Sequence, residues 1–188
     1  MMVDHGSGMR PAAYLTWFGV GLLWFATHPY LGVLWDSEYY TLQALHFLHP
    51  ERYAHDLFFA YGSQDQFTLF SRLYGPLIGM MGLARSNMLL TLIGQAVWFG
   101  GVAHLVRASR AYLDPFTALA GVMLIPGAAG LLFHYGEQVL TPRIYAEGMT
   151  LWAMGELWRG RRWRSAAWLI GGMMLHPLMV VPGWGMWW

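Results

Sequence analysis

Five long apolar stretches alternate with short polar segments along the chain, at 11–34, 86–106, 115–133, 144–158 and 165–182. A helix needs about 20 apolar residues to cross a bilayer, and these stretches approach or exceed that length. His28-Pro29 interrupts the first stretch and His176-Pro177 lies inside the fifth, but membrane helices tolerate such breaks. The pattern predicts an all-α polytopic membrane protein with about five transmembrane helices.

A sixth apolar stretch, 67–84, contains Arg72 and Gly75-Pro76. If it does not span and the N-terminus is cytoplasmic, seven of the eleven arginines lie inside. Cytoplasmic connectors are normally rich in such residues, so this arrangement is favoured. We therefore expect a surface or re-entrant helix at 67–84 and an extracytoplasmic loop at 35–85. The arginines placed inside are Arg10, Arg107, Arg110, Arg159, Arg161, Arg162 and Arg164.

Composition supports a membrane protein. Apolar residues make up 56% of the 188 positions and charged residues 11%, against about a quarter in soluble domains. These values exclude a disordered chain, and they favour membrane lipid over nucleic acid as the partner. The chain has no cysteine, which excludes disulfides and thiolate metal sites.

The chain shows no internal repeat, so we expect one membrane domain over 1–188. It stops at Gly-Trp-Gly-Met-Trp-Trp, directly after an apolar stretch. This favours the N-terminal part of a longer polytopic protein. The first stretch has no small-x-small cleavage site after it, and it is longer than the apolar core of a signal peptide. We therefore expect an uncleaved first span.

Unusual polar residues gather on the predicted outer side, which suggests a site there. The first outer loop holds Asp36, Glu38 and Asp56, and the second holds His134 and Arg143. Glu147 begins the fourth span from the same side, and His176 lies in the outer half of the fifth. We expect His134, Glu147 and His176 to support the site.

Asp36 and Glu38 follow the first span as an Asp-x-Glu pair. Two such carboxylates can bind a divalent cation or act as a base; alternatively, they mark where a span meets water. The apolar spacing after them predicts an interfacial helix that Pro50 closes. His46 and His49 share a helix face and could bind zinc with His55 and Asp56, or could simply form hydrogen bonds.

Arg143 and Glu147 are four residues apart at the start of a span. They can pair with each other, which would lower the cost of a membrane carboxylate. Alternatively, the Arg143 guanidinium can bind a phosphate. His176 is either a helix-packing hydrogen-bonding residue or part of the site.

Asp36-x-Glu38-Tyr39-Tyr40, Pro142-Arg143-x-Tyr145-Ala146-Glu147 and His176-Pro177, in this layout, resemble the N-terminal half of polytopic glycosyltransferases of the C superfamily, especially their bacterial relatives. The resemblance implies sugar transfer from a polyprenyl-phosphate donor at the outer face of the bacterial cytoplasmic membrane. Asp36, with Glu38 beside it, would be the base or metal ligand, Asp56 a second acid, and Arg143 the phosphate ligand. The Asp-Ser-Glu spacing departs from the adjacent Asp-Glu pair of protein mannosyltransferases.

Two other interpretations remain open. Breaks at Pro126 and Pro177 are also typical of transporters, although the ionisable residues gather at the outer edge. The chain could instead be a non-catalytic or truncated membrane protein. All of these proposals for a site require Asp36 and the Thr141-Pro142-Arg143 turn to lie on the same side.

Overall fold

The computed structural model describes residues 11–109 and 136–188. Every regular element in these two ranges is a helix, which confirms the predicted all-α class for this part of the chain. The predicted span 115–133, with Pro126, and the residues Arg10, Arg110 and His134 lie outside the described residues.

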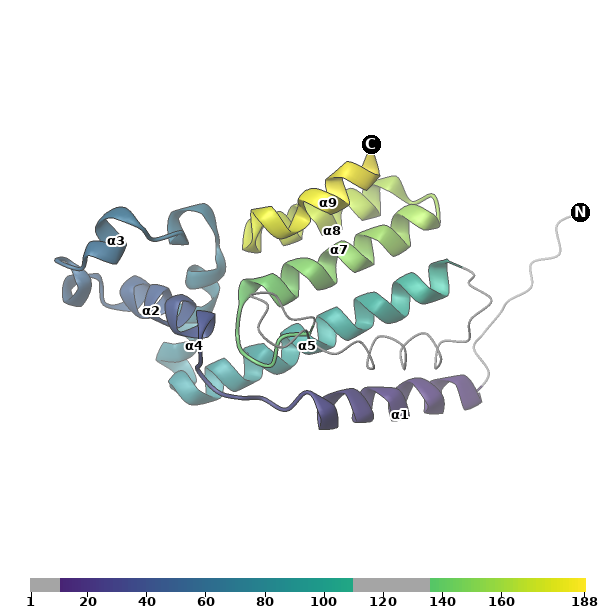
Figure 1. Cartoon of the computed structure of the whole chain (residues 1–188), viewed down its shortest axis with the longest axis horizontal. Coiled ribbons are helices and arrows are strands. Elements are labelled where there is room, and N and C mark those ends of the chain that lie inside the picture. Colours follow the sequence, from purple (N-terminus) through teal and green to yellow (C-terminus); the bar gives the residue numbers. More distant parts are fainter. Residues whose placement is uncertain (1–10, 110–135) are drawn as a thin grey trace, which may run out of the picture.

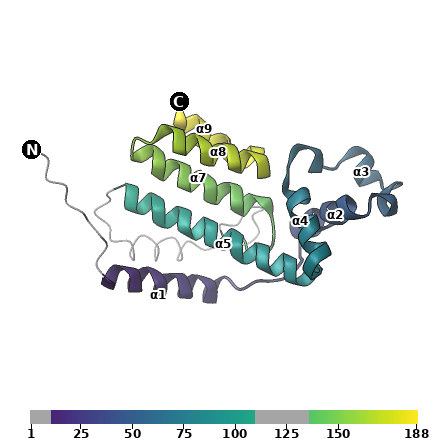
Figure 2. The same ribbon diagram turned by 180° about the vertical axis from the view of Figure 1, so that it is seen from behind.

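The longer helices form a bundle in which they lie side by side (Figure 1). These are α1 (Pro11–Thr27), α5 (Leu83–Ala108), α7 (Pro142–Trp158), α8 (Arg162–Leu175) and α9 (Pro177–Trp187). The segment after α1, the start of α7 and the turn between α8 and α9 meet at one end of the bundle. The view from behind shows the same order (Figure 2).

Short helices continue the chain beyond that end of the bundle: α2 (Asp36–Leu48), η1 (Pro50–Tyr53), α3 (Leu57–Tyr61), η2 (Asp65–Phe67) and α4 (Phe70–Met81). We call this end the α2–α4 end. The opposite end, where α5 and α7 finish and α8 begins, carries Arg107 and the 159–164 arginines, and we call it the arginine end. These described arginines therefore lie at one end of the bundle, as their predicted placement requires.

Glycines allow α5 and α7 to form the most extensive helix contact in the bundle. A Cβ at Gly101 would lie 2.6 Å from the Gly148 carbonyl oxygen, and one at Gly148 would lie 2.8 Å from the Trp98 nitrogen. Only glycine permits backbones to approach this closely. The glycines of these two apolar stretches therefore serve helix packing.

Buried polar side chains attach α2 and α4 to the start of α5. The Asn87 amide donates to the Tyr74 hydroxyl (2.8 Å) and, more weakly, to Ser37 (3.4 Å), and it accepts from Tyr30 (2.8 Å). At Gly82, with φ of +83°, the chain leaves α4 and enters α5. Through α4, the 67–84 stretch thus lies at the end of the bundle (Figure 1); its place as a surface or re-entrant helix stays a prediction.

The prediction of a single span at 165–182 is wrong, because this fifth apolar stretch is not one continuous helix. α8 ends at Leu175, His176 is extended (φ −153°, ψ 94°), and α9 begins at Pro177. At the far end of α9 the Trp187 indole donates to the Arg162 carbonyl oxygen (3.1 Å), so α9 returns to the start of α8. The predicted span 165–182 is therefore a helical hairpin that reverses at His176.

One described helix, α5, is long and apolar enough to cross a membrane. α1 is also apolar but ends at Thr27, so it covers only the first part of the predicted span 11–34. At 1.5 Å per residue, α1 and α7 are each about 26 Å long. The described part thus has one candidate span by length and composition.

Candidate functional site

An ion-pair network joins the starts of α2 and α7. Arg143 Nη1 lies 2.5 Å from Asp36 Oδ2, and Arg143 Nη2 lies 2.7 Å from Glu137 Oε1. Arg143 Nε also donates to Glu137 Oε1 (2.9 Å), and the Thr141 hydroxyl donates to the second oxygen of Glu137. Asp36 and the Thr141-Pro142-Arg143 turn thus lie in contact, as a shared site requires.

Burial differs sharply within this network. The side chain of Asp36 is 40% exposed, whereas those of Arg143 and Glu137 are 12% and 6% exposed. A buried charge is costly unless it is paired and hydrogen-bonded. Glu137 and Arg143 therefore depend on each other, while Asp36 is the member that solvent or a ligand can reach.

The segment 136–141 is held against the end of α1 and against α5. Gly136, with φ of +61°, passes over Trp24 so closely that a Cβ would lie 2.2 Å from the indole. The Gln95 amide of α5 donates to the backbone carbonyls of His28 (3.2 Å) and Glu137 (3.3 Å). This packing fixes Glu137 and, through it, Arg143.

Asp36 is presented by a tight turn at the start of α2. The Ser37 N–H donates to the Leu34 carbonyl (3.1 Å), and Trp35, in between, has φ of 52° and ψ of −128°. Asp36 then stands in the first turn of α2, where the helix dipole favours a negative charge. The side chain is therefore directed by backbone geometry as well as by Arg143.

Three further polar side chains interact electrostatically with the network: Tyr40, Glu147 and His176. Burial raises the pKa of Tyr40; Arg143 opposes the rise, and Asp36 and Glu137 add to it. Tyr40 therefore stays neutral and can offer a hydroxyl. The Nδ1 atom of His176 is buried and has no hydrogen-bond partner among the described residues.

Of the two alternatives for Arg143, the ion pair with Glu147 does not form within 4 Å between these two described residues. Arg143 instead pairs with Asp36 and Glu137, and the Glu147 carboxylate accepts a hydrogen bond from the Trp98 indole (3.2 Å). Side chains in a helix point toward its N-terminus. Arg143, in the first turn of α7, therefore reaches back to the preceding loop and away from Glu147.

The other predicted acids of the loop lie outside the network. Glu38 is exposed. Asp56 caps α3, because its carboxylate accepts the Phe58 N–H (2.8 Å). The role of each in catalysis remains a prediction.

The predicted metal ligands do not gather in the structure. Among the described residues, no three side chains of metal-binding type converge on one point. His46 lies 3.5 Å from Asp65 and His49 lies 3.7 Å from Glu51. Asp36 is held by a guanidinium, so the residues present do not fit a divalent cation or zinc.

Some members of polar clusters were not singled out from the sequence. Glu137 and Thr141 were visible as loop residues, but nothing in their spacing indicated a contact with Arg143. At the arginine end, His104 Nε2 lies 2.9 Å from the buried Glu156. His104 and Glu156 lie on different helices, so sequence spacing could not reveal the pair.

Comparisons with protein-family models, curated proteins and solved structures found no match for this chain.

Proposed function

We propose that the chain is part of a polytopic protein of the bacterial cytoplasmic membrane, with the α2–α4 end outside and the arginine end in the cytosol. Support comes from the length and hydropathy of α5 and from the arginines gathered at one end of the bundle. The flank of α1 adds to this, because it exposes large apolar side chains that lipid would cover: Leu15, Phe18, Leu22 and Leu23.

We propose further that the Asp36–Arg143 network transfers a sugar from a polyprenyl-phosphate donor. The observation that carries this proposal is a reachable carboxylate held 2.5 Å from a buried guanidinium at the predicted outer end. A base and an anion partner are the two groups that such a reaction needs. The resemblance to the glycosyltransferase superfamily assigns these roles to the same two residues.

In the proposed reaction, an acceptor hydroxyl oxygen attacks the anomeric carbon of the sugar. The bond from that carbon to the phosphate oxygen breaks, and its electrons leave with the polyprenyl phosphate. The acceptor proton passes to the Asp36 carboxylate. No metal takes part in this scheme.

Arg143 has a double role in this proposal. Its guanidinium is already engaged by Asp36 and Glu137, so the donor phosphate would have to replace Asp36 at Nη1. The exchange would neutralise the charge that develops on the phosphate and would release the Asp36 carboxylate toward the acceptor. Glu137 would hold the guanidinium in place throughout.

The test uses the purified full chain in lipid nanodiscs with undecaprenyl-phosphate sugars that carry radiolabelled mannose, glucose or aminoarabinose. We expect Asp36→Asn to abolish consumption of the donor that the unmodified chain uses. Asp65→Asn, in the same loop but outside the network, is the matched control and should retain activity. Thermal unfolding of each variant shows whether the fold is intact. Full turnover by a folded Asp36→Asn protein contradicts the proposal.

Transport is a second candidate, favoured by one observation. The α8–α9 hairpin reverses at His176, near enough to Arg143 for their charges to interact, and interrupted helices are typical of transporter binding sites. Flux of a labelled solute into proteoliposomes without consumption of any lipid-linked sugar would favour transport over sugar transfer.

A further inference from the structure

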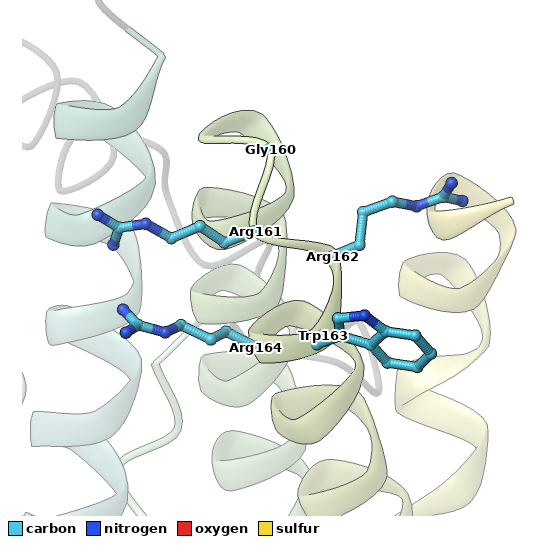
Figure 3. A pocket seen from close by; sticks show the side chains of 5 residues that line it. All are labelled: Gly160, Arg161, Arg162, Trp163 and Arg164. Carbon is cyan, nitrogen blue, oxygen red and sulfur yellow. The ribbon is translucent and has the colours of Figure 1, made fainter.

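The turn between α7 and α8 concentrates arginines in a short segment. Gly160, with φ of +74°, allows the chain to reverse, and four arginines stand at 159, 161, 162 and 164. An open pocket of about 380 Å³ lies here, lined by residues 160–164. Figure 3 shows Arg161 and Arg164 extended to one side of it, and Arg162 and Trp163 to the other.

Internal contacts position this cluster but do not neutralise it. Arg161 Nη1 lies 3.5 Å and Arg159 Nη1 3.8 Å from Glu156. Glu156 is the one acidic residue at the arginine end within 11–109 and 136–188. Arg164 is exposed and forms no ion pair with any described residue. The pocket therefore keeps an excess of positive charge.

Arg162 is fixed in place by the end of α9. Its Nη2 donates to the Trp187 carbonyl (3.0 Å), and its guanidinium carbon lies 4.7 Å from the centre of that indole ring. A guanidinium held this way loses less side-chain freedom when it binds an anion.

An exposed tryptophan stands within the cluster, and exposed apolar side chains lie farther along the same two helices. Trp163 is 85% exposed, and exposed tryptophans are typical of the level of lipid headgroups. Toward the α8–α9 turn at His176, the exposed apolar residues are Ile170, Met173 and Val181. A free phosphate would need none of these apolar surfaces, whereas a phospholipid would cover them with its chains.

We propose that this arginine-lined pocket binds the phosphate headgroup of an anionic phospholipid, with Arg161 and Arg164 on one side of the headgroup and Arg162 and Trp163 on the other (Figure 3). Guanidinium groups pair well with phosphate oxygens, and basic pockets at helix ends on the cytoplasmic side bind such lipids. The lipid site lies at the end opposite the Asp36–Arg143 network. It goes beyond the proposed sugar transfer and depends only on insertion in a membrane.

The experiment is a native mass spectrometry titration of the full chain, purified in a non-ionic detergent, with tetraoleoyl cardiolipin or with dioleoyl phosphatidylcholine. We expect cardiolipin to bind more tightly than phosphatidylcholine. Arg164→Gln should weaken cardiolipin binding about fivefold, because a juxtamembrane arginine is worth about 1 kcal/mol toward anionic lipid. Arg72→Gln, an exposed arginine on α4 at the opposite end, should leave binding unchanged.

Equal affinity for the two lipids, or equal loss in the Arg164 and Arg72 variants, overturns the proposal. Sodium phosphate added at the lipid concentration should not displace cardiolipin; full displacement would assign the pocket to a free anion instead. No sugar donor is present, so failure here leaves the proposed sugar transfer unaffected, and loss of donor turnover leaves the lipid site unaffected.

Discussion

Trp35 has a backbone conformation that side chains rarely adopt, and it directly precedes the acid we propose as the base. Among the described residues it is the one non-glycine residue with positive φ. Such a conformation costs about 1–3 kcal/mol and persists where surrounding structure enforces it. Here the enforcing contacts are the turn to Ser37 and the ion pair of Asp36 with Arg143. The strained residue thus directly precedes Asp36 and helps to set the direction of its side chain.

Trp35→Gly should raise the free energy of unfolding by about 1 kcal/mol. Glycine adopts this conformation without strain, and the strain removed exceeds the extra conformational entropy that glycine loses on folding. Tyr39→Gly is the matched control, an exposed aromatic residue inside α2, where glycine should destabilise by about 1 kcal/mol. Denaturation in mixed detergent micelles measures both. Equal destabilisation by the two changes would show that Trp35 is not strained.

At the residue scale, the sequence could single out Asp36 and Arg143 as candidate site residues, because each stands at the boundary of an apolar stretch. It could not predict Glu137 as the partner of Arg143, since that contact depends on how Gly136 packs over Trp24 and how Gln95 holds the loop. The Arg143–Glu147 spacing was misleading for a geometric reason. An arginine four residues before a glutamate is in the less favourable order for such a pair. Arg143 instead reaches back along the helix to Asp36 and Glu137.

At the element scale, the sequence located some helix ends and missed others. Pro50 follows the end of α2 as predicted, but α1 ends just before His28-Pro29 and does not continue to residue 34. His176-Pro177 was correctly recognised as a break, but the break reverses the chain and does not merely bend it. A residue before proline avoids the helical region, and proline suits the first position of a new helix. Whether such a break kinks or reverses a chain is decided by tertiary contacts, here those of Trp187 with Arg162.

Gly148→Ala tests the α5–α7 contact. The added Cβ would lie 2.8–2.9 Å from backbone atoms of Trp98, which cannot move without separating the helices. We expect a loss of about 1–3 kcal/mol in the free energy of unfolding. Gly185→Ala in α9, whose Cβ would meet nothing within 4 Å, should not destabilise. An unchanged stability for Gly148→Ala would mean that the two helices are farther apart.

At the scale of the whole molecule, charge is separated along the bundle. The arginine end combines Arg107 and the 159–164 arginines with a single described acid, Glu156. At the α2–α4 end acids outnumber arginines: Asp36, Glu38, Glu51, Asp56, Asp65 and Glu137 stand against Arg52, Arg72, Arg85 and Arg143. In a membrane protein such a separation sets orientation, because basic residues remain in the cytosol. The proposed sugar-transfer site and the proposed lipid site lie at opposite ends of this arrangement.

The orientation can be measured directly, because the chain has no cysteine and each introduced one is therefore the single target. Tyr61 in α3 and Trp163 at the start of α8 are almost equally exposed, at 88% and 85%, so their intrinsic accessibility is matched. Tyr61→Cys and Trp163→Cys are treated with a membrane-impermeant maleimide in right-side-out vesicles. We expect labelling of Tyr61→Cys at once and of Trp163→Cys only after detergent is added. Labelling of both from the same side, or the reverse order, would contradict the account.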